Sequence, residues 1–175
     1  MVVHIAPIGK NVAHVKEWLR EVQPITKVWL IHSKKSDDYN FPKAAKDLAK
    51  KIQEDYAGVD VELQLNENPL NLDGTMDAID AIISKEQKEN DVEKYEFCIN
   101  VTGGTNVMSA AAILSATFNG ARAQYVLNRN MNPGQKSYVE ELPIPPIGFA
   151  KMNENQQKVL QVILRSTYVL RGGDK

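Results

Sequence analysis

Short apolar segments alternate with amphipathic segments along most of this 175-residue sequence. The apolar segments have the length and the β-branched content of β-strands. We expect strands over Val2–Ala6, Lys27–His32, Val59–Leu65, Tyr95–Val101, Ala121–Asn128 and Tyr138–Leu142. The segments between the first five strands carry apolar residues at helical spacing. We expect a helix that Asn11 caps and helices over Pro42–Tyr56, Asn71–Glu89 and Val107–Phe118.

Strands that alternate with helices form βαβ units. This order predicts an α/β fold with a mostly parallel sheet and helices on both faces. No helix separates the last two strands, so we expect an antiparallel hairpin at one edge of the sheet. The proline-rich segment Leu142–Gly148 is a boundary signal. We therefore expect a ligand-binding domain over residues 1–142 and, over 143–175, a linker and a C-terminal helical appendage at Asn153–Leu164.

The charge balance argues against a large non-specific nucleic-acid surface. The formal net charge is −1, whereas such a surface needs a clear basic excess. The single cysteine, Cys98, lies in a predicted strand, and His4, His14 and His32 lack metal-ligand spacing. We predict no disulfide, no metal and no cofactor. His4 and His32 fall in predicted strands, and His14 is expected to be a solvated helix residue.

The hydropathy pattern predicts no membrane partner. No apolar run has the length that spans a bilayer, and the N-terminal ten residues are too short and weakly charged for a signal peptide. The cysteine content is compatible with a reducing cytoplasm.

The loops that follow the strands carry the residues suited to a ligand. Ligands of parallel α/β sheets bind at the carboxyl ends of the strands. These loops contain the sequences APIGKN, SKKSDD, TGGTN and NRN, with few carboxylates, only Asp37 and Asp38. Their cations are Lys10, Lys34, Lys35 and Arg129. This edge of the sheet is therefore expected to bind an anion.

Two glycines stand between two threonines in the segment INVTGGTNVMSAAAI, where a strand meets a helix. Without a Cβ at Gly103 and Gly104, a ligand could approach the backbone closely. The unpaired N–H groups at the start of the following helix favour a phosphate. Neither GxxxxGK[ST] nor GxGxxG is present. A simpler interpretation, a tight turn with Thr105 as the N-cap, remains open from the residues alone.

The segment NVTGGTNVMSAAAI resembles the TGGT[KR] signature of the CARF family, the CRISPR-associated Rossmann-fold ligand sensors. The order of strands and helices up to Leu142 is similar to that family, and APIGKN lies where its other ligand-binding loop falls. One departure is Asn106, where the family often has Lys or Arg. The resemblance implies a Rossmann-like fold in a cytoplasmic archaeal or bacterial protein.

The resemblance also implies that a homodimer binds cyclic oligoadenylate, with cyclic tetra-adenylate favoured. Three interpretations stay open: a sensor domain of a transcriptional regulator, a metal-independent ring nuclease, and an unrelated nucleotide- or anion-binding domain. Asn106 favours binding without efficient cleavage, with Lys10 as the candidate catalytic residue. The predicted ligand-binding residues are Ile8, Gly9, Lys10, Asn11, Ser33, Lys34, Thr102, Gly103, Gly104, Thr105, Asn106, Met108 and Arg129.

The segment Val107–Phe118 is apolar nearly all round, so we expect a helix buried on every side, in part against a partner subunit. The tail resembles the first helix of the winged-helix domain that follows the sensor in CARF regulators. Its length is about half that of a complete winged helix. DNA is therefore expected as a partner only through a winged helix that residues 143–175 do not complete.

Overall fold

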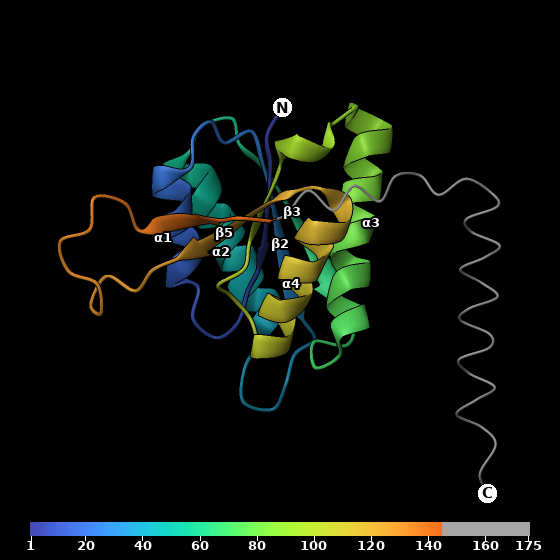
Figure 1. Ribbon diagram of the computed structural model, residues 1–175. Helices are drawn as coiled ribbons and strands as arrows, with labels where there is room; N and C mark the ends of the chain where they lie inside the picture. The colour runs from blue at the N-terminus through green and yellow to red at the C-terminus, as the bar shows by residue number, and fades with distance from the viewer. Residues whose placement is uncertain (145–175) are drawn as a thin grey trace, which may run out of the picture.

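The computed structural model describes residues 1–144 (Figure 1). The helix predicted at Asn153–Leu164 lies outside the described residues. Within residues 1–144, none of the helices combines the length and the apolar character needed to cross a bilayer.

Six strands form one mixed sheet, as predicted. In chain order they are β1 (Val3–Pro7), β2 (Lys27–Ser33), β3 (Asp60–Asn66), β4 (Phe97–Asn100), β5 (Arg122–Val126) and β6 (Val139–Leu142). Their order in the sheet is β3-β2-β1-β4-β5-β6. The first five strands are parallel, and β6 pairs antiparallel with β5. The predicted α/β fold with its antiparallel edge hairpin is confirmed.

Helices cover both faces of this sheet (Figure 1). They are α1 (Ala13–Glu21), α2 (Phe41–Asp55), α3 (Leu72–Asn90) and α4 (Asn106–Asn119), with a short 3-10 helix, η1, at Lys94–Glu96. Helices α1 and α2 pack on one face, and α3 and α4 pack together on the other. The loop between β5 and β6 extends away from the sheet.

The alternation of side chains along the strands builds two separate cores. In β1, Ile5 packs in the core under α3 and α4, whereas Ala6 packs in the core under α1 and α2. Successive residues of a strand point to opposite faces, so a strand covered on both sides must be apolar throughout. All residues of β1, β2 and β4 are buried, as expected for central strands.

Two local predictions need correction. Asn11 does not occupy the N-cap of α1. Val12 does, while the Asn11 side chain accepts a hydrogen bond from the Ala13 N–H at 2.9 Å. Helix α4 is not buried on every side, because Ile113, Leu114 and Phe118 are between 37% and 46% exposed in the single chain. The apolar composition of α4 therefore leaves an outer stripe uncovered by residues 1–144.

Candidate functional site

The order of the strands reverses between β1 and β4. Strands β2 and β3 continue from β1 in one direction, and β4 and β5 lie in the other. The loops that follow β1 and β4 therefore begin side by side at the carboxyl edge, where parallel α/β sheets bind ligands.

These two loops touch each other at glycine. A Cβ on Gly9 would lie 3.3 Å from the Gly104 Cα and 3.4 Å from its nitrogen, so the two backbones are packed against each other. Gly9 precedes α1 and Gly104 precedes α4. The contact therefore brings the N-termini of two helices together, and with them two positive dipole ends.

Several backbone N–H groups at this contact are without a partner. Within residues 1–144, the N–H groups of Gly9, Lys10, Gly103, Gly104 and Asn106 form no hydrogen bond. Unpaired N–H groups at helix N-termini are the usual protein contacts for a phosphate. We call Gly9–Asn11 together with Gly104 the ridge.

A cavity lies on each side of the ridge. Cavity A has a volume of about 650 Å³ and lies between the β1–α1 loop, the end of β2, the β3–α3 loop and α4. Cavity B, of about 560 Å³, lies between the β1–α1 loop, α1 and the β5–β6 loop. All four ridge residues line both cavities. Both volumes are in the range of small-molecule sites.

All of the predicted ligand-binding residues except Asn106 line at least one of the two cavities. Cavity A includes Ile8, Ser33, Lys34, Thr105 and Met108, and cavity B includes Thr102, Gly103 and Arg129. Asn106 is exposed at the first position of α4.

The structure corrects the reason for the two adjacent glycines. A Cβ on Gly103 would lie 2.2 Å from both the His14 Nε2 and the Pro7 carbonyl oxygen. Gly104 has a φ of +86°, and its Cβ would lie 2.7 Å from the Met108 Sδ. Protein atoms therefore occupy the space of both missing side chains. The glycines therefore let this loop pack closely against the end of β1, the start of α1 and α4.

The two threonines differ in what they offer a ligand. Thr105 caps α4 as predicted, because its Oγ1 accepts from the Met108 N–H at 3.1 Å. The same hydroxyl donates to the Pro69 carbonyl oxygen at 3.1 Å, so its proton is already used. The Thr102 Oγ1 only accepts, from the Val126 N–H at 2.7 Å. Thr102 therefore keeps a hydroxyl proton that it can donate to an anion in cavity B.

The prediction that His14 is solvated is wrong. Its ring packs against Gly103, and its buried Nε2 has no hydrogen-bond partner within residues 1–144. Burial lowers the pKa of His14, although the carbonyl groups of Pro7 and Asn11 oppose this effect. The imidazole is therefore neutral at pH 7. No sequence pattern signals this contact, which joins residues far apart in the chain.

Carboxylates at this edge are more numerous than expected. Glu67, which follows β3, forms an ion pair with Lys34 in cavity A. Glu17 of α1 accepts from the Arg129 Nε at 2.5 Å in cavity B. Lys10 forms no ion pair with any residue of 1–144. Of the predicted cations, Lys10 is thus the one that lines both cavities and is free to meet a phosphate.

Sequence reasoning missed the β3–α3 loop. It contributes Glu67, Pro69 and Leu70 to cavity A. This segment, NENPLN, also follows a parallel strand, so the rule that placed the other loops at this edge applies to it equally.

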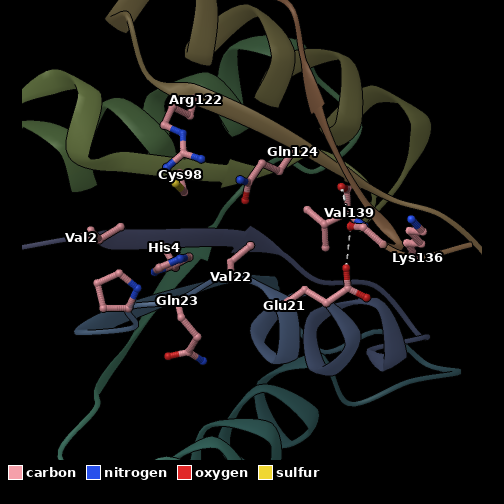
Figure 2. A pocket seen from close by; sticks show the side chains of 12 residues that line it. Val2, His4, Glu21, Val22, Gln23, Cys98, Arg122, Gln124, Lys136 and Val139 are labelled. Atoms are coloured by element: carbon pink, nitrogen blue, oxygen red, sulfur yellow. Dashed lines mark hydrogen bonds between the residues drawn. The ribbon is translucent and has the colours of Figure 1, made fainter.

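A third cavity of about 550 Å³ lies between the C-terminal end of α1 and strands β1, β4, β5 and β6 (Figure 2). Its Arg122 is held by both oxygens of Glu141, at 2.6 and 2.7 Å. Burial, and secondarily the charge of Arg122, lower the pKa of His4 to about 4. Burial raises the pKa of the Cys98 thiol to about 11. Its histidine and thiol are thus neutral at pH 7, Arg122 is paired with Glu141, and its remaining charged residues, Lys136 and Glu21, have opposite charges, so this cavity has no excess of positive charge.

Within residues 1–144, no group of three His, Cys, Asp or Glu side chains is arranged to hold a metal ion.

Several solved structures share this fold. The first is Csm6 of Enterococcus italicus bound to cyclic hexa-2′-fluoro-hexa-dAMP, with a TM-score of 0.67 and 16% identity. The match covers 95% of this chain and 46% of that one. The second is Can2 from Sulfobacillus thermosulfidooxidans in complex with cyclic tetra-adenylate, with a TM-score of 0.56 and 17% identity. That match covers 71% of this chain and 31% of Can2.

A third structure is a type III CRISPR defence DNA nuclease activated by cyclic oligoadenylate, with a TM-score of 0.52 and 18% identity over 71% of this chain and 18% of that one. The chain thus spans less than half the length of these proteins. The predicted resemblance is thus confirmed at the level of the fold, which this chain shares with two proteins solved with cyclic adenylates and with a nuclease activated by cyclic oligoadenylate.

Curated proteins provide no match to the sequence. The family model described as "HFX_2341_N:-like, N-terminal" matches residues 2–130, which include the ridge and nearly all of both cavities. Since this match extends over most of the chain, the protein belongs to the HFX_2341_N:-like, N-terminal family.

Proposed function

We propose that this chain is a sensor domain that binds cyclic oligoadenylate at the ridge. The observation that carries the proposal is the contact between Gly9 and Gly104, which places two helix N-termini and several unpaired N–H groups together. A chain of phosphodiesters matches such a row of donors. The shared fold with Csm6 and Can2, both solved with cyclic adenylates, supports this ligand class.

The proposed assembly is a homodimer that forms through α4. This helix begins beside the ridge, and its exposed side chains include Ile113 and Leu114. Two copies that cover this apolar stripe would bring their ridges toward a common two-fold axis. A ring with two-fold symmetry, such as the favoured cyclic tetra-adenylate, suits a site shared in this way.

The chain is proposed to bind the ring without efficient cleavage. In-line attack by a ribose 2′-hydroxyl needs a donor that stabilises the developing charge. Asn106 supplies no cation at the start of α4, and the flexible side chain of Lys10 is exposed. We further propose a cytoplasmic archaeal or bacterial protein that couples binding to transcription regulation. DNA contact is proposed to require a winged-helix domain.

The variant Asn106→Asp tests the binding site without a cost to the helix. Aspartate is favourable in the first turn of a helix, because it interacts with the N-terminal dipole. The same charge would repel a phosphate that approaches the ridge. We expect cyclic tetra-adenylate to bind at least about tenfold more weakly, with an unchanged or higher melting temperature.

The control for this experiment is Gln53→Glu, which makes the same charge change at an exposed site on α2. Equal affinity of Asn106→Asp and the control would place the ligand elsewhere. Analysis of the products after the wild-type titration tests the proposal that the ring is not efficiently cleaved. The ring should stay intact over minutes, and rapid conversion that Lys10→Ala abolishes would show a ring nuclease.

A further inference from the structure

Each cavity beside the ridge carries one cation–carboxylate pair. In cavity A the ammonium of Lys34 meets Glu67, and in cavity B the guanidinium of Arg129 meets Glu17. The two carboxylates come from separate elements, the β3–α3 loop and α1. The same arrangement thus occurs on both sides of the row of free N–H groups.

The pair in cavity B is the more firmly held. Arg129 Nε donates to the Glu17 Oε2 at 2.5 Å, and its Nη2 lies 3.6 Å from the Glu21 Oε1. The guanidinium also lies 4.0 Å from the centroid of the Tyr138 ring. Glu17 in addition accepts from Arg20 at 2.7 Å. A ligand that uses Arg129 must therefore displace or tolerate the Glu17 carboxylate.

The pair in cavity A is open to solvent. The side chains of Lys34 and Glu67 are both 64% exposed. Exposed ion pairs contribute little stability, so Lys34 can exchange Glu67 for a phosphate at small cost. The carboxylate stays in the cavity after this exchange, and it repels any anion there in proportion to the charge of that anion.

Phosphate esters differ in that charge. A terminal phosphate monoester carries close to two negative charges at pH 7, whereas each phosphodiester of a nucleotide chain carries one. The unpaired N–H groups of the ridge can serve either kind of phosphate. The two flanking carboxylates penalise the monoester more.

We infer that Glu17 and Glu67 are specificity-determining residues that select phosphodiesters over phosphate monoesters and polyphosphates. The inference rests on the proposed function, because it concerns the same ridge. A cyclic oligonucleotide has only diesters, whereas 5′-AMP, ATP and linear products with a terminal phosphate have monoesters. The carboxylates thus reject abundant mononucleotides by like-charge repulsion.

The test compares 5′-AMP with 3′,5′-cyclic AMP, which share one base and differ in the charge of the phosphate. Affinities of both nucleotides and of cyclic tetra-adenylate are measured by calorimetry for wild type, Glu17→Gln, Glu67→Gln and the double variant. We expect 5′-AMP affinity to rise about fivefold for each substitution. The gain for the two diester ligands should be about twofold or less.

Glu54→Gln is the matched control, since Glu54 pairs with Lys50 and Lys51 on α2, away from both cavities. It should leave all affinities unchanged. The inference is overturned if the double variant binds 5′-AMP no tighter than wild type. It is also overturned if the affinities for 5′-AMP and 3′,5′-cyclic AMP rise equally. A wild type that does not bind cyclic tetra-adenylate would instead overturn the proposed function. The comparison of the two mononucleotides tests the carboxylates separately.

Discussion

At Gly103 the imidazole of His14 and the carbonyl group of Pro7 occupy the space that a side chain would need. At Gly104 the backbone itself has a positive φ, and Met108 fills the nearby volume. The two residues look alike in the sequence, but their physical requirements differ. Gly103 allows a close approach to α1 and the end of β1, and Gly104 allows a left-handed turn before a helix.

The substitution Gly103→Ala is expected to destabilise the protein by about 1–3 kcal/mol, because overpacking of a closed site forces neighbouring atoms to move. Denaturant unfolding measures this change. Gly58→Ala is the comparison: Gly58 has a φ of +82° but nothing within 4 Å of its Cβ position. It isolates the cost of the left-handed backbone, about 1 kcal/mol. A smaller effect at Gly103 than at Gly58 would contradict the packing described here.

His4 should make stability depend on pH. Burial and the charge of Arg122 lower its pKa from 6.5 to about 4 in the folded protein. The unfolded chain therefore binds the proton more readily, and stability falls as the pH decreases from about 6.5 to about 4. The loss from this group is on the order of 3 kcal/mol. Urea unfolding of wild type and His4→Gln across this range should show a steeper loss in wild type. Equal dependence of the unfolding free energy on pH in the two proteins would exclude this role of His4.

At the scale of single residues, the roles that depend on neighbouring residues in the chain can be predicted from the sequence. Thr105 follows a turn and precedes a helix, so its capping role can be predicted from position alone. The contact of His14 with Gly103 cannot be predicted, because helical periodicity describes a face and not the partner it meets. For the same reason Glu17 gives no sign that it neutralises Arg129, which lies more than a hundred residues later.

Among the elements of residues 1–144, the predicted strands and helices agree with the structure to within a few residues. The apolar segments are continuous because β1, β2 and β4 are covered on both faces. The β3–α3 loop is the omission that matters, since Glu67 and Leu70 line cavity A. Its role follows from the parallel topology rather than from a motif.

Helix α4 is expected to form the interface of a dimer. Burial of its exposed stripe, which includes Ile113 and Leu114, should hold two chains together. Sedimentation at micromolar concentration is expected to show a two-chain species for wild type. Leu114→Glu should shift this species to a single chain by placing a charge in the interface.

The variant Gln53→Glu adds the same charge on α2 and should remain a two-chain species. Melting temperatures of both variants separate dissociation from unfolding. A wild type that sediments as a single chain even at high concentration would contradict a binding site shared between two chains. A Leu114→Glu variant that keeps two chains would place the interface on another face.

For the molecule as a whole, the strand order decides where the site lies. The reversal between β1 and β4 brings the loops of two distant segments into contact and leaves a cavity on each side. The alternation of strands and helices predicts the edge at which ligands bind, but not the division into two cavities. That division depends on the packing of Gly9 against Gly104, which joins residues that are remote in the sequence.

Calorimetric titration of the wild-type chain with cyclic tetra-adenylate tests the proposed shared binding site, because it reports both binding and the number of chains per ring. We predict saturation at one ring for every two chains, with weaker binding as salt increases because phosphates are the groups recognised. Saturation at one ring per chain would contradict the shared site. Absence of binding to both cyclic tetra-adenylate and cyclic hexa-adenylate would contradict the sensor function itself.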